Sequence, residues 1–86
     1  MAQNQMIEHV LHVKNRYEEK LMTQANVVGV GVGFKTINGQ ETDILSVVVN
    51  VTQKLPLVEL AFKDVVPVEL EDVPTDVQEV GTLRAL

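Results

Sequence analysis

The chain has 86 residues and a mass of 9.5 kDa, which is the size of one small domain covering 1–86. Its net charge of −5 and its pI of about 4.8 argue against nucleic acid and anionic membrane as partners, because both bind basic surfaces. Cysteine is absent, which excludes disulfides, cysteine-ligated zinc and thiol chemistry.

The start of the chain, Met1 to Gln5, is polar and lacks the basic and then apolar order of a signal peptide. The longest apolar run is far shorter than the ~20 residues that span a bilayer. We therefore expect a cytoplasmic protein. Its charge is uneven, because residues 1–54 sum to zero whereas residues 55–86 carry two basic and seven acidic side chains. We interpret this acidic third as a solvated surface, with a cation site or a basic partner as the alternative.

Residues 5–24 show the apolar periodicity of an amphipathic helix. The apolar stripe recurs every three or four residues, and Ile7 and Leu11 widen it. Its members are Met6, Val10, Val13, Tyr17 and Leu21.

Residues 26–36 change to the two-residue period of a β-strand. One face carries Val28, Val30, Val32 and Phe34, and the other face carries Gly29, Gly31 and Gly33. Because glycine weakens the interior of a strand, three alternating glycines predict a close approach to that face. The N-terminal helix or a neighbouring subunit would supply it.

Asn38-Gly39 predicts a type I′ turn and therefore a β-hairpin. The second strand is expected over 42–52, and its richness in valine favours a central position in the sheet. One of its faces carries Leu45, Val47, Val49 and Val51.

The remaining residues predict shorter elements. Pro56 favours a short helix over 57–62, and Pro67 confines 65–68 to an edge or an irregular crossing. A turn is expected at Glu71-Asp72, a bend at Pro74-Thr75-Asp76, a last short strand between Val77 and Val80, and a loose tail over 82–86. The fold class is α+β, with a sheet module over 26–81 that forms a small antiparallel sheet.

Chemistry-bearing residues are few. His9 and His12 stand three apart on the predicted helix and are weak candidates for metal ligands, more simply read as surface histidines. The only serine, Ser46, falls within a valine-rich strand, so we expect neither a catalytic site nor a cofactor. The glycines do not have the G-x-G-x-x-G spacing of a nucleotide site.

The part of the chain that follows the predicted helix also carries a series of short motifs. They are Asn26–Lys35 (NVVGVGVGFK), Val47–Val51, Lys54-Leu55-Pro56, Leu60, Val66-Pro67, and Val73–Val77 with Gly81. In this order they resemble the N-terminal segment of bacterial trypsin-like serine peptidase homologues of the narrow-leaf type, over residues 26–81. In that family the segment precedes the peptidase barrel, so no catalytic triad is carried over to this chain. The resemblance implies a stand-alone copy of a leading module.

The leading hypothesis is a non-catalytic protein-interaction or self-assembly module that forms a homo-oligomer or binds another protein. The apolar strands and helix exceed what so short a chain encloses easily. Two alternatives are a metal- or ligand-binding regulatory domain, in which His9 and His12 meet carboxylates near Asp72 and Asp76, and an accessory module of a trypsin-like peptidase. The expected interaction residues are Tyr17, Val28, Gly29, Val30, Gly31, Val32, Gly33, Val47 and Val49.

Overall fold

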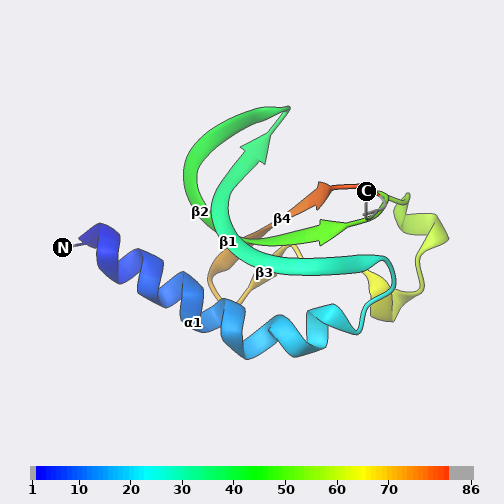
Figure 1. Cartoon of the computed structure of the whole chain (residues 1–86), viewed down its shortest axis with the longest axis horizontal. Coiled ribbons are helices and arrows are strands. Elements are labelled where there is room, and N and C mark those ends of the chain that lie inside the picture. Colours follow the sequence, from blue (N-terminus) through cyan, green and yellow to red (C-terminus); the bar gives the residue numbers. More distant parts are fainter. Residues whose placement is uncertain (1, 82–86) are drawn as a thin grey trace, which may run out of the picture.

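The computed structural model describes residues 2–81, so the predicted tail 82–86 lies outside the described residues. The chain forms one helix and a mixed four-stranded sheet (Figure 1), which confirms the α+β class. In chain order the elements are α1 (Ala2–Met22), β1 (Val27–Ile37), β2 (Gln40–Val51), the 3₁₀ helices η1 (Leu57–Glu59) and η2 (Phe62–Asp64), β3 (Glu69–Leu70) and β4 (Val73–Glu79).

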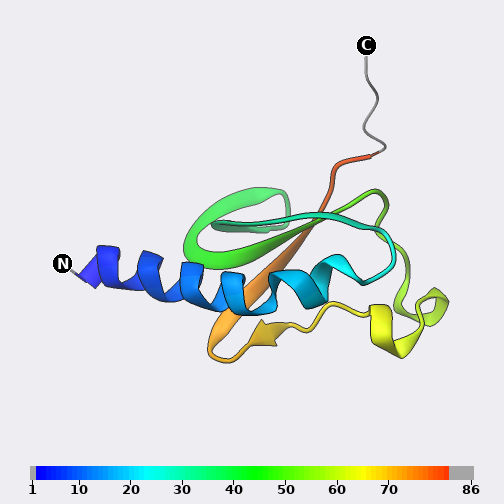
Figure 2. The ribbon, with the colours of Figure 1, turned by 60° about the horizontal axis from the view of Figure 1, so that its bottom comes forward.

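α1 packs its apolar stripe on one face of the sheet (Figure 2). Val10, Val13 and Leu21 are buried there, as the periodicity predicts, whereas Met6 is 54% exposed. The helix ends where the Thr23 hydroxyl donates to the Lys20 carbonyl at 2.6 Å. No helix among residues 2–81 is long and apolar enough to cross a membrane.

The β1–β2 hairpin has the predicted two-residue turn. Ile37 pairs with Gln40, and the intervening Asn38 and Gly39 have φ angles of +52° and +80°, as a type I′ turn requires. β2 is central, as its valine content predicts, because the strand order is β1-β2-β4-β3.

The sheet is mixed, which corrects the expectation that it is antiparallel throughout. β2 and β4 are parallel, with Val49 opposite Val77, because the chain crosses over between them through η1, η2 and β3. The bend predicted at Pro74-Thr75-Asp76 is also wrong, since all three residues lie inside β4. Pro74 is tolerated at the second position of this strand, where it pairs with Glu69 of the two-residue strand β3.

One apolar core lies between α1 and the sheet. Valine dominates it because the strands present β-branched side chains at every second position. Tyr17, Val30 and Val32 pack against its buried members without being fully buried themselves. The buried members are Val10, Val13, Leu21, Val27, Val47, Val49, Val51, Leu70 and Val73.

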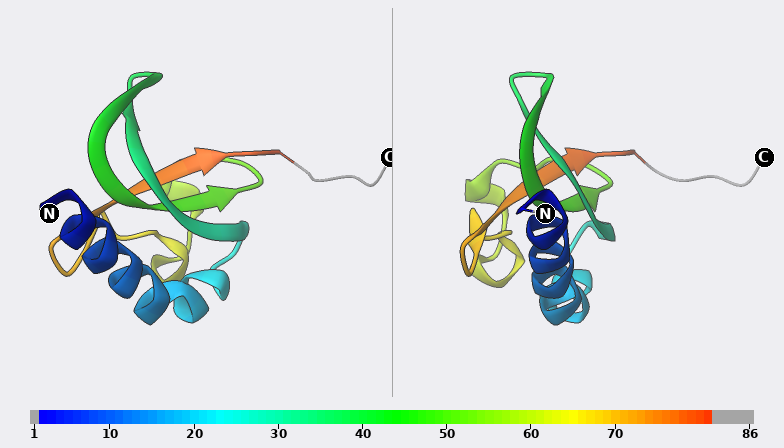
Figure 3. Two further views of the ribbon diagram at one scale, coloured as in Figure 1. Left: turned by 60° about the vertical axis from the view of Figure 1, so that its left-hand side comes forward. Right: turned by 90° about the vertical axis from the view of Figure 1, so that its left-hand side faces the viewer.

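The hairpin bends strongly away from α1 (Figures 1 and 3). Because Val30 and Val32 pack against the core beneath α1, the glycines that alternate with them face the concave side. The Thr36 N–H donates to Asp76 Oδ2 at 3.0 Å, and Lys35 Nζ donates to the Thr75 carbonyl at 2.7 Å. These bonds fold the far end of the hairpin over β4. The curvature therefore requires little side-chain volume on the inner side of β1.

The glycines lie on this concave side, opposite the helix. A Cβ at Gly33 would lie 3.2 Å from Val48 Cγ2, and one at Gly29 would lie 3.4 Å from Asn50 Nδ2. A Cβ at Gly31 would have nothing within 4 Å. The expectation that α1 covers this face is thus wrong. The close neighbours of Gly29 and Gly33 are side chains of β2. That a neighbouring subunit covers this face stays a prediction.

Candidate functional site

Five of the residues expected to form an interaction surface are part of the core. Val47 and Val49 are fully buried, and Val30, Val32 and Tyr17 pack against the core. They occupy these places because α1 covers the valine-bearing face of the hairpin. This corrects the assignment of Val47 and Val49 to a surface, since a partner of the folded chain has no access to them, whereas Val30, Val32 and Tyr17 are only partly buried.

The other expected residues lie along the edge of the sheet. Within residues 2–81, β1 pairs only with β2, so the other side of its backbone has no partner strand. A bulge places Val28 between the pairs Val27–Val51 and Gly29–Asn50, so that Val27 enters the core and Val28 is exposed. β1 is therefore an edge strand, and its stretch from Val28 to Phe34 is of the type that accepts a further strand, whereas the Thr36 N–H is already bonded to Asp76.

α1 has an apolar side beyond its buried stripe. Ile7, Leu11 and Met22 are exposed and project from one side of the helix, which we call the apolar flank. His9, His12 and Arg16 project from the opposite side, because the 3.6-residue period separates the two groups. The periodicity of the sequence assigned Ile7 and Leu11 to the buried stripe, and the structure corrects this.

The histidine side of α1 binds the β3–β4 turn. His9 Nε2 donates to Asp72 Oδ1 at 2.7 Å, and Arg16 Nη1 donates to Glu71 Oε2 at 2.8 Å. Arg16 Nη2 also donates to His12 Nε2 at 2.9 Å. The turn at Glu71-Asp72 is the predicted one, with Glu71 at a φ of +59°. These bonds fix which side of α1 faces β3 and β4, so the apolar flank lies on the side of β1.

The hydrogen bond from His9 holds the pKa of the Asp72 carboxyl below its usual value of 3.8. Both groups are largely exposed, with side-chain exposures of 48% for His9 and 76% for Asp72. Solvent screens such a pair strongly, so the bond orients the helix more than it stabilises the fold.

Of the residues expected to meet, His9 and Asp72 do so, but Asp76 does not join them. Asp76 lies on the concave side, where it accepts hydrogen bonds from Thr36 and from Gln78 Nε2. Nε2 of His9 faces a carboxylate, and Nε2 of His12 accepts from a guanidinium, which has only donors. Within the described residues no group of three or more metal-ligating side chains is present.

Two buried polar residues of the sheet have partners within the chain. Ser46 is fully buried and its hydroxyl donates to the Gly33 carbonyl at 3.1 Å, as expected for a residue of the sheet interior. Asp76 is 7% exposed and is satisfied by its two donors. Neither side chain is presented to solvent as a nucleophile or a base.

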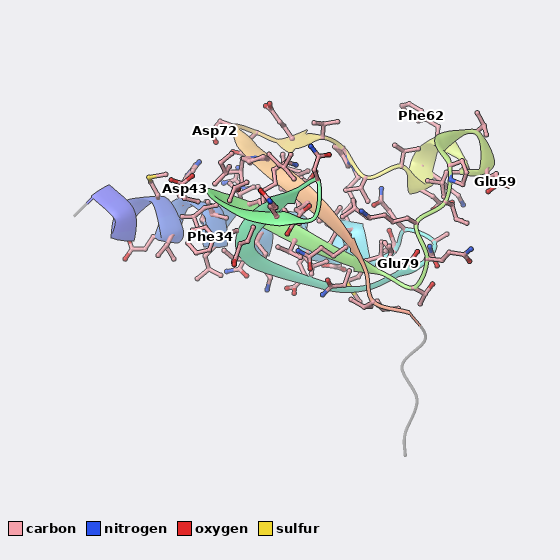
Figure 4. The ribbon with its side chains drawn as sticks, turned by 90° about the horizontal axis from the view of Figure 1, so that it is seen from above. Phe34, Asp43, Glu59, Phe62, Asp72 and Glu79 are labelled. Carbon is pink, nitrogen blue, oxygen red and sulfur yellow. The ribbon has the colours of Figure 1, made fainter. Side chains whose placement is uncertain are left out.

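The segment between β2 and β3 carries exposed apolar side chains that the sequence did not indicate. Val58 and Phe62 are 93% and 96% exposed, and Val68 is also exposed. Figure 4 shows Phe62 at the end of the molecule opposite the start of α1. Beside this segment, Val27, Val51 and Leu60 help to line an open groove of about 290 Å³. The signal that was missed is the short 3₁₀ geometry, which cannot bury a full apolar stripe.

No family model matches the sequence, and no curated protein is significantly similar to it. The resemblance of residues 26–81 to the leading segment of trypsin-like peptidase homologues therefore stays a prediction.

Proposed function

We propose that the chain is a non-catalytic module that acts by associating with protein, first of all with copies of itself. The observation that carries this proposal is the edge of β1 that has no partner strand within residues 2–81, flanked by the exposed apolar side of α1. A long edge strand without a partner, next to exposed apolar surface, is a common site of association between chains.

The opposite edge of the sheet, β3, is protected against pairing with another chain, and this makes the unprotected edge of β1 the better candidate for association. β3 has only two residues, and the charged residues Glu69, Glu71 and Asp72 surround it. Short and charged edges are the means by which proteins block unwanted pairing. β1 has neither protection between Val28 and Phe34, where the residues are all valine, glycine or phenylalanine.

The size of the chain supports association as well. A domain of this length buries about 60% of the surface of its unfolded chain. Among the side chains that the structure describes, nine apolar residues, most of them valine, are buried in the core and twelve large apolar residues remain exposed. Association would cover part of this surface.

The test is sedimentation velocity of the purified chain from low to high micromolar concentration. We expect the sedimentation coefficient to rise with concentration from that of one chain to that of an assembly. A single species of 9.5 kDa throughout this range would overturn the proposal. High salt is the matched control, because apolar association persists in salt whereas weak charge contacts are lost.

A further inference from the structure

The central residues of β1, 29–33, have the same sequence in both directions and are flanked by two apolar residues, Val28 and Phe34. Residues 28–34 are Val-Gly-Val-Gly-Val-Gly-Phe, with Gly31 at the centre. In an antiparallel pair of two such strands, Gly31 would face Gly31, Val30 would face Val32, and Gly29 would face Gly33. A two-fold interface requires this kind of self-complementarity, because the same surface of each copy meets the other.

We infer that two copies of this chain pair antiparallel along β1, about a two-fold axis that passes through Gly31. The two four-stranded sheets then form one continuous sheet, and the two α1 helices lie side by side on the same face of it. This inference rests on the proposed function and specifies the partner and the surface through which it acts.

The position of the axis follows from the faces of the strand. Opposed residues in an antiparallel pair project to the same face. If the two-fold axis passes through a residue, valines of the two strands lie opposite each other on the helix-bearing face, and glycines lie opposite each other on the concave face. An axis between two residues would oppose valine to glycine, which puts the two helices on opposite faces. Among the axes through residues, the one at Gly31 matches the longest run, from Val28 to Phe34.

The apolar flank of α1 supplies the second part of the interface. α1 packs on both β1 and β2, and its flank of Ile7, Leu11 and Met22 overhangs the β1 side. With strands about 4.8 Å apart, two helices placed over the β1–β2 pair of each copy would lie about 10 Å apart. Packed helices have this separation, so the two flanks would meet directly.

Charge also favours this surface over the other apolar one. The net charge of −5 comes entirely from residues 55–86, which include Val58, Phe62 and Val68. α1 and the hairpin belong to the neutral part, 1–54. On the apolar flank, Lys14 and Glu18 neutralise each other at 2.9 Å. Two identical copies therefore repel least when they meet through α1 and β1.

A cysteine at the axis tests the register directly. The chain has no cysteine, and a Cβ at Gly31 would have nothing within 4 Å, so Gly31→Cys adds one thiol without a clash. The inferred axis puts the two copies of this residue within the Cα separation of a disulfide, about 4.4–6.8 Å. We expect rapid formation of a disulfide-linked dimer under mild oxidation, seen on a non-reducing gel.

Val28→Cys is the matched control, because Val28 is also exposed on β1. In the inferred register Val28 lies opposite Phe34, so the two copies of residue 28 are six residues apart along the strand, or about 20 Å at about 3.4 Å per residue. The same oxidation should therefore form little disulfide-linked dimer on the gel. Equal or faster cross-linking of Val28→Cys would overturn the inference.

A second pair of variants separates this inference from the proposed function. Leu11→Glu adds a charge to each apolar flank, and we expect it to weaken the dimer at least tenfold in sedimentation equilibrium. Phe62→Glu, at a more exposed site, should leave the dimer unchanged. Circular dichroism checks that both variants keep the fold. If Phe62→Glu dissociates the assembly and Leu11→Glu does not, self-association stands and the inferred surface is wrong. A monomeric wild-type chain contradicts both proposals.

Discussion

A hydrogen bond between Thr36 and Asp76 connects the tip of the β1–β2 hairpin to β4 across the concave side of the sheet. The Thr36 N–H, near the tip of the hairpin, donates to Oδ2 of a carboxylate that is 7% exposed at the middle of β4. The bond links residues 40 positions apart and holds the hairpin in its bent form.

Asp76→Ala should therefore destabilise the fold. It leaves the N–H of Thr36 and the amide of Gln78 without their acceptor, and an unsatisfied buried donor costs about 1–3 kcal/mol. Chemical denaturation in urea measures this loss as a lower free energy of unfolding. Asp43→Ala removes the same charge from an exposed position and should change that free energy by less than about 0.5 kcal/mol. Equal effects of the two variants would show that the bond to Thr36 does not hold the hairpin.

The His9–Asp72 pair predicts a dependence of stability on pH. Because the pKa of Asp72 is lower in the folded chain than its usual 3.8, the ionised carboxylate favours the folded state. Its contribution is present above the unfolded-state pKa and is lost as the pH falls through the folded-state value.

The comparison is between the wild type and Asp72→Asn, by thermal unfolding from neutral pH to acid. The difference in Tm should be largest near neutral pH and should vanish well below pH 3.8. Asp43→Asn serves as the control for a general loss of one negative charge. A difference that grows toward acid would contradict the assigned direction.

The valine core predicts a contrast between two truncations. Val49→Ala removes two carbon atoms from a fully buried side chain and should cost about 2 kcal/mol, counting both the lost burial and the cavity. Val58→Ala makes the same change at a side chain that is 93% exposed and should cost less than about 0.5 kcal/mol. Urea unfolding at a single low protein concentration measures both. A large effect at Val58 would mean that this residue is covered in solution.

Changing a glycine to alanine should alter the free energy of unfolding differently at Gly31, Gly33 and Gly39, because their surroundings and φ angles differ. Gly31→Ala should raise the free energy of unfolding by about 0.5 kcal/mol, because it restricts the unfolded chain and its Cβ meets nothing. Gly33→Ala should be less stable than Gly31→Ala, since its Cβ would lie 3.2 Å from Val48. Gly39→Ala, at a φ of +80°, should lose about 1 kcal/mol to left-handed strain. Thermal unfolding in parallel gives the order, and a Gly31→Ala variant that is the least stable of the three would contradict the open space at that position.

The parts of the fold that could be predicted from the sequence are those specified by neighbouring residues. The spacing of Val10, Val13 and Leu21 defines the buried side of α1, and Asn38-Gly39 defines the hairpin turn. Both signals are local, because helix periodicity and turn conformation depend on a few consecutive residues.

The first half of β4 was missed, and only a last short strand from Val77 was predicted, because the conformation of β4 depends on distant partners. Pro74 and Asp76 have the local preferences of a bend, yet Thr75 lies opposite Val47 and its hydroxyl donates to the carbonyls of Pro67 and Val68. Parallel pairing of this kind leaves no short-range signal, since the strands are joined by a long crossover.

The candidate interaction surface was predicted only in part for a related reason. Alternation along β1 and β2 separates two faces, but it does not say which of them the helix covers. Val47 and Val49 were therefore assigned to a surface that α1 occupies. The pairing of His9 with Asp72 joins residues 63 positions apart and has no marker in the sequence beyond an acidic C-terminal third.

The crossover between β2 and β4 has a consequence for the order of folding during translation. α1 and the hairpin end at Val51, so they emerge from the ribosome before β4, which begins at Val73. Until the later residues close that loop, the edge of β2 that will pair with β4 has no partner strand, although β2 carries the core residues Val47, Val49 and Val51. The nascent chain is therefore most vulnerable to aggregation while β2 has emerged from the ribosome and β4 has not.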